Sequence, residues 1–241
     1  LISMLVPYTL QEAYDESGPN GEFEKYLVLE RDQIYYGGIG IFSGDVYINC
    51  QGSIIDLNNQ TGIWLYSDSN YLSSLHIEYC NIINGDTYGL SFSGEAFGKV
   101  SNCNFYNNDI GLKAFDYTQV EIENSNFINN RTYGLGIITE NPQVTVNHSN
   151  SWGNIEGDYW ENCPGWGNIW TPWVFDDSDL NLVYQDPLFI DTDNLNFQYS
   201  SDSPCIDAGN PDLFDLDGTV RDIGANIFYN ILLGDCNQDS T

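Results

Sequence analysis

The sequence predicts an all-β solenoid, a chain wound into similar successive coils, and three observations predict it. The first is a repeated phrase: CNIINGDTYGL at 80–90 is followed by CNFYNNDIGL at 103–112 and SNFINNRTYGL at 125–135. The second is a regular spacing of glycines, and the third is an alternation of apolar and polar residues. Repeats of this length are typical of chains whose units stack on one another.

The glycine spacing sets the length of one coil. Gly40, Gly62, Gly89, Gly111 and Gly134 each precede Ile or Leu, at intervals of 22, 27, 22 and 23 residues. Two apolar series keep a similar step: Ile77, Val100, Ile122 and Val146, and Ile82, Phe105 and Phe127. Equivalent residues should therefore stack about 4.8 Å apart, the usual spacing of paired strands, with the apolar series inside.

The local pattern indicates strands and bends. VEIEN at 120–124 and YGLGI at 133–137 alternate with a period of two, which is typical of strands. No helical stripe competes with this period across 34–150. A further series, Asn81, Asn104, Asn126 and Asn150, should lie at bends. Asparagine tolerates left-handed backbone there, and its amide can bond the asparagine one coil away.

A period of about 22 residues with asparagine at the bends resembles the right-handed parallel β-helix. That class includes pectate lyases, polygalacturonases, alginate epimerases and many surface proteins. VPYTLQEAYDES at 6–17 is similar to the short helix that caps the first coil of such proteins. The segment 186–225 resembles the closing segment of a family of bacterial secreted β-helix repeat proteins. The resemblance implies fold and export, and it implies no single activity.

The domain organisation follows from these elements. Residues 1–233 form a single β-helix domain, with coils at about 27–150, an aromatic insertion at 151–185 and a closing segment at 186–230. GDCNQDST at 234–241 resembles the truncated start of a dockerin-type Ca²⁺ loop. The acidic ligand expected at position twelve of such a loop is not in the sequence, so we interpret this tail as the edge of an anchoring or sorting module.

The charge balance excludes some partners. The chain has 6 Lys and Arg against 35 Asp and Glu, a formal net charge of −29. Nucleic acids and anionic membrane surfaces need a cationic face, so both are poor partners. No run of about 18 apolar residues occurs, so no membrane insertion is expected. The opening LISMLV is too short for a signal peptide and lacks basic residues, so in an exported protein we expect that peptide to be already removed.

The six cysteines contain no CxxC pair, so neither a zinc ribbon nor a thioredoxin-like site is supported. Cys80 and Cys103 occupy the same coil position and should stack. We expect two buried thiols there rather than a disulfide, because both side chains point the same way.

The basic residues are catalytic candidates, because the resemblance to β-helix lyases implies a Lys or Arg base beside Ca²⁺-binding acids. Lys99 stacks between His76 and Glu121, which indicates a surface ion pair. Arg131 stacks next to Asp86 and Asp109 and is a weaker catalytic candidate for the same reason. Lys113 stacks between Ser91 and Gly136, neither of them charged, and is the best candidate for a base; a solvated surface lysine is the alternative.

Other enzyme signatures are missing from the sequence. The Gly-His-Gly and Arg-Ile-Lys motifs of polygalacturonases do not occur, and the DD pair at 176–177 is weak support for acid–base chemistry. No P-loop, Rossmann glycine pattern or HExxH motif occurs.

An aromatic segment offers a candidate binding surface. Residues 152–175 break the repeat and contain five of the six tryptophans. An aromatic platform for sugar rings would use ring faces that combine apolar area with a polar group; a packed loop over one face of the solenoid is the alternative. The candidate ligand-binding residues are Tyr159, Trp160, Trp166, Trp170 and Trp173.

Aspartates in the closing segment offer a candidate metal site. DLDG at 215–218 has the spacing of half a Ca²⁺ loop, and Asp222 lies nearby. Asp215, Asp217 and Asp222 are therefore candidate ligands for Ca²⁺. Capping of turns by aspartate is the alternative.

We therefore expect a secreted or cell-surface bacterial protein that is a non-catalytic binding or structural module, with polysaccharide as the favoured ligand. The alternative from another class is a polysaccharide lyase or epimerase acting on uronates. A third interpretation is a subunit of an extracellular filament, because the ends of a solenoid expose strand edges that can pair end to end with another chain.

Overall fold

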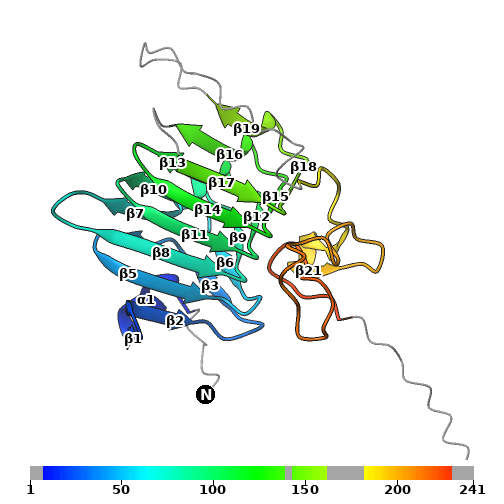
Figure 1. The fold of residues 1–241 in the computed structure, drawn as a ribbon, viewed down its shortest axis with the longest axis horizontal. Coiled ribbons are helices and arrows are strands. Elements are labelled where there is room, and N and C mark those ends of the chain that lie inside the picture. Colours follow the sequence, from blue (N-terminus) through cyan, green and yellow to red (C-terminus); the bar gives the residue numbers. More distant parts are fainter. Residues whose placement is uncertain (1–7, 139–142, 162–181, 230–241) are drawn as a thin grey trace, which may run out of the picture.

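The computed structural model describes residues 8–138, 143–161 and 182–229. Within these ranges the chain winds into six coils, and each coil places one strand in each of three sheets (Figure 1). Sheet 1 contains β1 (Gly18–Asn20), β2 (Phe23–Val28), β5 (Gly44–Asn49), β8 (Ser73–Glu78), β11 (Phe97–Ser101), β14 (Gln119–Glu123) and β17 (Gln143–Asn147). Sheet 2 contains β3 (Ile34–Tyr36), β6 (Ile54–Asp56), β9 (Asn81–Ile83), β12 (Asn104–Tyr106), β15 (Asn126–Ile128) and β18 (Asn150–Trp152). Sheet 3 contains β4 (Gly40–Ile41), β7 (Ile63–Ser67), β10 (Tyr88–Gly94), β13 (Ile110–Phe115), β16 (Tyr133–Ile138) and β19 (Gly157–Glu161).

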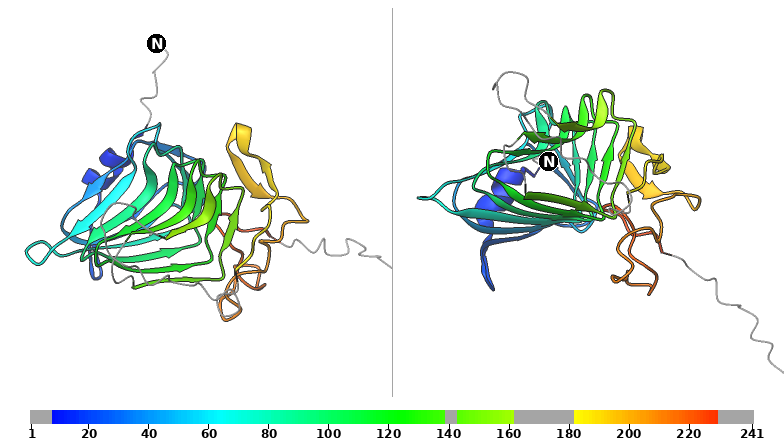
Figure 2. Two further views of the ribbon diagram at one scale, coloured as in Figure 1. Left: turned by 90° about the horizontal axis from the view of Figure 1, so that it is seen from above. Right: turned by 45° about the horizontal axis from the view of Figure 1, so that its top comes forward.

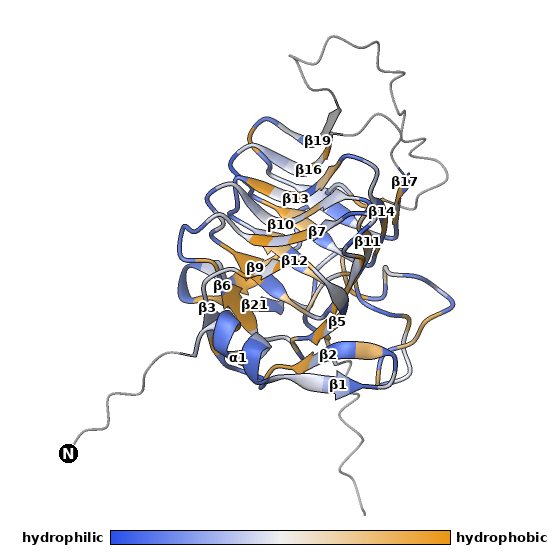
Figure 3. Ribbon diagram, turned by 90° about the vertical axis from the view of Figure 1, so that its left-hand side faces the viewer, coloured by the Kyte–Doolittle hydropathy of each residue, from blue (hydrophilic) through white to orange (hydrophobic). Residues whose placement is uncertain are grey.

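The predicted all-β solenoid is confirmed. Neighbouring strands within the three sheets pair in parallel, except for the short β1, which is antiparallel to β2. The apolar series pair as predicted, because Val100 lies opposite Ile77 and Ile122, and Phe105 lies opposite Ile82 and Phe127. Figure 3 shows apolar colour along the strands and hydrophilic colour at many bends. The side chains that point inward therefore form one continuous core along the solenoid.

A short helix covers the first coil, as the sequence predicts. α1 (Leu10–Glu16) begins after Thr9, whose side chain accepts from the Glu12 backbone, while the Glu12 carboxylate accepts from the Thr9 backbone. Leu10 is fully buried in the core, and Ala13 and Tyr14 pack against it. The Lys25 ammonium donates to the carbonyls of Tyr14, Asp15 and Ser17, and so satisfies acceptors at the end of the helix.

The predicted glycine column exists, with one correction. Gly62, Gly89, Gly111 and Gly134 stack at the start of the sheet 3 strands, and a Cβ added to Gly89 would lie 2.6 Å from the Gly111 carbonyl oxygen. The first coil contributes Gly38 to this column, because its Cβ would meet the Gly62 carbonyl. Gly40, which the glycine spacing assigns to this series, pairs instead with Trp64, two residues beyond Gly62.

The asparagine series forms a buried ladder. The amide of Asn104 donates to Asn81 at 2.7 Å, Asn126 donates to Asn104 at 2.8 Å, and Asn150 donates to Asn126 at 3.1 Å. These residues begin the strands of sheet 2 and are not the left-handed ones, which corrects part of the prediction. Left-handed backbone flanks them at Tyr79, Asn102, Asn124 and His148 on one side and at Asn84, Asn107 and Asn129 on the other.

One cysteine prediction is wrong. Cys103 is a buried free thiol at the coil position of Cys80, but Cys80 forms a disulfide with Cys50, and their Cα atoms are 4.8 Å apart. The second coil has four residues between its sheet 1 and sheet 2 strands, whereas the third has two. Because of this longer bend, Cys50 is not the simple stacked equivalent of Cys80, and the argument from parallel side chains does not apply to it.

The regular coils extend further than predicted. Residues 151–161 belong to the sixth coil, because β18 pairs with β15 and β19 pairs with β16. In the next described range, Val183 forms a parallel bridge with Asn150. The part of the predicted insertion at 162–181 and the dockerin-like tail at 234–241 lie outside the described residues.

The closing segment runs back along the side of the coils (Figures 1 and 2). It contains a small hairpin, β20 (Phe189–Asp191) and β21 (Asn196–Tyr199), joined by the 3-10 turn Thr192–Asn194. Its contacts follow the asparagine ladder: Asn150 donates to the Gln185 carbonyl, Asn126 to the Tyr199 hydroxyl, and Asn81 to the Asn226 side chain. The segment therefore spans the coils from the sixth to the third and satisfies polar groups of the ladder.

Candidate functional site on the outer face of sheet 3

One register column on sheet 3 joins two residues predicted separately from the sequence. Going along the solenoid, Trp64 lies opposite Ser91, Ser91 opposite Lys113, Lys113 opposite Gly136, and Gly136 opposite Trp160. The two tryptophans are four coils apart, roughly 19 Å at the usual strand spacing. Lys113 stands midway between them, and a small residue separates it from each. We call this set the Trp64–Trp160 column.

Trp64 forms the described aromatic end of the column. Its indole nitrogen donates to the Ser93 hydroxyl on the next coil at 2.7 Å, so the ring extends over that coil. The side chain nevertheless stays 39% exposed. Phe42 packs edge-on against the indole at 5.2 Å, and Tyr66 lies at 6.2 Å between ring centroids. The result is an anchored, partly exposed ring with a polar contact, which suits contact with a sugar ring.

Lys113 has the uncharged stacking partners that the sequence predicts, Ser91 and Gly136. Its ammonium lies 5.1 Å from the centre of the Phe115 ring and 6.0 Å from that of Tyr88. No ion pair with a described residue holds it. The ammonium can therefore donate hydrogen bonds to a ligand, and the aromatic rings limit where it lies.

Arg131, the second catalytic candidate, is engaged in holding bends together. Its guanidinium donates to the carbonyls of Asn107 and Gly85 and lies 3.8 Å from the Asp86 carboxylate. Burial raises the pKa of Asp109, and the charge of Arg131 opposes that rise. This side chain thus links three successive coils, and the structure does not bring it together with Lys113.

The predicted aromatic residues divide into two groups. Tyr159 and Trp160 lie in β19, and their backbone positions pair with Leu135 and Gly136. Trp166, Trp170 and Trp173 lie outside the described residues. Trp152, from the same aromatic run, is 43% exposed on sheet 2 and does not belong to the column.

Sequence reasoning missed Trp64 as a site residue, although a signal was present. Four members of the Trp64–Trp160 column lie two residues after a glycine of the glycine column: Trp64, Ser91, Lys113 and Gly136. Reading that one position across successive coils would have placed Trp64 in line with Lys113. The other five tryptophans gather at 152–173 and give a more conspicuous signal than the single Trp64.

The three candidate calcium ligands do not converge in the structure. Asp215 accepts from the Asp222 backbone and lies 3.8 Å from Arg221. Asp217 accepts from the backbone and hydroxyl of Thr219, and Asp222 accepts from the backbones of Asp207 and Phe228. Within the described ranges, no group of three or more His, Cys, Asp or Glu is placed to hold a metal ion. These contacts match the turn-capping alternative, and calcium binding stays a prediction.

The fold and this column define a parallel β-solenoid with a partly aromatic outer face. A family model described as a right handed beta helix region matches residues 19–163, more than half of the chain. The protein therefore belongs to the right-handed β-helix family. No curated protein and no solved structure matches the chain. In the part of the chain that the structure describes, no helix is long and apolar enough to cross a membrane.

Proposed function

We propose that the protein binds polysaccharide without catalysis, outside a bacterial cell or at its surface, and that the Trp64–Trp160 column is the binding face. The observation that carries this proposal is the anchored Trp64 indole in register with the Lys113 ammonium. An extended sugar chain running along the solenoid would place one sugar ring over the Trp64 indole and other hydroxyls of the chain near the Lys113 ammonium. The column is linear, so it suits a polymer better than a single small molecule.

The Cys50–Cys80 disulfide supports the extracellular part of the proposal, because disulfides persist mainly in oxidising compartments. Under this proposal the tail at 234–241 would begin an anchoring module of the dockerin type. The resemblance to pectate-lyase-like proteins supports polysaccharide as the class of ligand, but it does not identify a particular sugar.

The proposal is tested by affinity electrophoresis in gels containing xylan, mannan, β-glucan or polygalacturonate. We expect at least one polymer to retard the protein. Trp64→Ala and Lys113→Ala should each weaken the affinity for that polymer by about tenfold or more, which is about 1.4 kcal/mol. Trp152→Ala and Lys99→Ala are matched controls from other sheets and should behave as wild type. Equal retardation of all five proteins would contradict the assignment of the binding face.

Lyase activity is the second candidate, favoured by the uncharged strand neighbours of Lys113. Ultraviolet absorbance of unsaturated uronates, measured with pectate and alginate in the presence of Ca²⁺, separates it from binding. We expect no turnover. Robust turnover that is lost in Lys113→Ala would replace the binding proposal with an enzyme.

Filament formation is the third candidate, and imaging of the native protein separates it from the other two. Single particles are expected, and end-to-end fibres would favour the structural role.

A further inference from the structure

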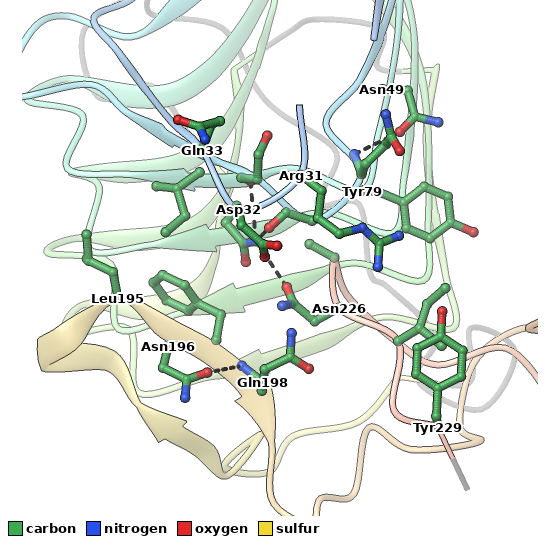
Figure 4. Close-up of a pocket in the computed structure, with 18 of the residues that line it drawn as sticks. Arg31, Asp32, Gln33, Asn49, Tyr79, Leu195, Asn196, Gln198, Asn226 and Tyr229 are labelled. Carbon is green, nitrogen blue, oxygen red and sulfur yellow. Dashed lines mark hydrogen bonds between the residues drawn. The ribbon is translucent and has the colours of Figure 1, made fainter. Parts of the chain in front are cut away.

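A second candidate site, which is a pocket, lies on the opposite side of the solenoid from sheet 3. A pocket of about 690 Å³ opens where the closing segment meets the bends between sheets 1 and 2 of the first three coils (Figure 4). One wall comes from these bends, at 31–34, 49–54 and Tyr79. The other comes from β21 and the loops at 214–216 and 225–229. The pocket lies between the closing segment, which contacts the ladder as far as Asn81, and the bends of the first two coils.

The lining of this pocket, which we call the closing-segment pocket, is rich in amides and formally neutral. Eight lining side chains are Asn or Gln, and the charged ones are Arg31, Asp32, Asp215 and Arg221. Two positive and two negative groups cancel, in a protein whose net charge is −29. Each amide offers donors and an acceptor. Such a lining selects a neutral ligand that is rich in hydrogen-bonding groups over a cation or an anion.

Some polar groups of the lining have no partner within the described chain. The side chains of Gln33, from the coil wall, and Gln198, from β21, make no hydrogen bond there, and both are exposed (Figure 4). In the wall, the buried Ser53 hydroxyl likewise lacks a hydrogen bond with the described residues, whereas Asp215 and Arg221 form an ion pair with each other, 3.8 Å apart. Ser53 is only 1% exposed. The exposed Gln33 and Gln198 amides therefore have donors and acceptors that a ligand in the pocket can use.

Two aromatic rings beside the amides narrow the class of ligand. The rings of Tyr79 and Tyr229 also line the pocket, and Tyr229 is 41% exposed. Rings beside convergent polar groups are typical of sites that hold a sugar by its face and its hydroxyls.

We infer that the closing-segment pocket binds a short neutral saccharide, with Gln33 and Gln198 contacting hydroxyls from opposite walls. This site is separate from the Trp64–Trp160 column and does not depend on the function proposed for that column. It also gives the closing segment a ligand-binding role beyond covering the asparagine ladder.

Calorimetric titration of the full chain with cellotetraose, xylotetraose, mannotetraose and galactotetraose tests this inference. At least one of these probes should bind, and the double variant Gln33→Ala/Gln198→Ala should weaken it at least tenfold. Both side chains are exposed, so the variant should fold, and its melting temperature verifies this. Gln119→Ala, which removes an exposed amide from sheet 1, and Trp64→Ala should leave the affinity unchanged.

Three results would overturn the inference. They are binding of none of the four probes, binding that the double variant leaves intact, and tighter binding of the anionic probe trigalacturonate than of any neutral one. Loss of affinity in Trp64→Ala alone would instead assign the sugar to the Trp64–Trp160 column, so the two proposals can fail separately.

Discussion

Asp222 shows how burial and capping compete at a single residue of the closing segment. Its carboxylate is 1% exposed and accepts two backbone N–H groups. Burial raises its pKa to about 6, although those hydrogen bonds oppose the rise. The folded protein therefore holds a proton on this group more tightly than the unfolded chain does. Its contribution to stability is complete below the ordinary aspartate pKa and is lost as the pH rises through about 6.

Asp222→Asn should therefore flatten the pH dependence of stability between about pH 4 and about pH 6. The contribution removed is at most about 1.4 kcal/mol per pH unit. The measurement is the free energy of unfolding in urea at several pH values. Asp212→Asn removes an exposed carboxylate from the same segment and is the matched control. If both variants keep the wild-type slope, Asp222 does not titrate in this range.

At the scale of the elements, close stacking of coils explains why particular residue types recur. In the first five coils, the start of the sheet 3 strand passes so close to the next coil that only glycine fits. From the third coil onward, each sheet 2 strand begins with an asparagine, because an amide can donate to one neighbour and accept from the other. Each column depends on the next coil, so a change at one position should affect the pairing on both sides.

Gly89→Ala tests this dependence. The added methyl group would lie 2.6 Å from the Gly111 carbonyl oxygen, so the strands must separate. We expect a loss of about 1–3 kcal/mol in the free energy of unfolding, the usual cost of overpacking. Gly18→Ala, where nothing lies within 4 Å of the new atom, is the control and should change stability by about 0.5 kcal/mol or less. A Gly89→Ala protein as stable as the control would show that the coils have room to move apart.

At the scale of the whole molecule, the net charge of −29 opposes the compact state. Any salt should relieve this repulsion by screening. A calcium site at Asp215, Asp217 and Asp222 would add a specific gain, but these carboxylates already accept hydrogen bonds from the chain. The described geometry therefore favours screening as the main effect of added salt.

We expect CaCl₂ and NaCl at equal ionic strength to raise the melting temperature alike, and differential scanning calorimetry measures both. A larger gain with Ca²⁺ that Asp217→Asn removes would instead establish the predicted site. A specific ion at a hundredfold excess over its Kd stabilises the folded state by about 2.7 kcal/mol, which is well above the error of this comparison.

The sequence alone determined the solenoid, because each coil repeats the register of the one before it. Equivalents of Val100, Phe105 and Gly111 recur in successive coils at similar intervals. Those intervals are enough to pair the residues across coils. It also identified the capping helix and the uncharged strand neighbours of Lys113. The solenoid and the neighbours of Lys113 depend on contacts between consecutive coils, which the repeat shows directly, and the helix was indicated by the local sequence at 6–17.

Only the tertiary structure decided the features that depend on irregular segments. The Cys50–Cys80 disulfide arises from a longer bend in one coil, and the repeat pattern does not show the path of that bend. The closing-segment pocket brings Gln33 and Gln198 together across 165 positions of sequence, because a segment without the repeat folds back on the first coils. Periodicity specifies which residues stack, whereas the path of a non-repeating chain depends on packing with the whole solenoid. For that reason the sequence determined the scaffold of this protein, and the tertiary structure decided where a ligand could bind.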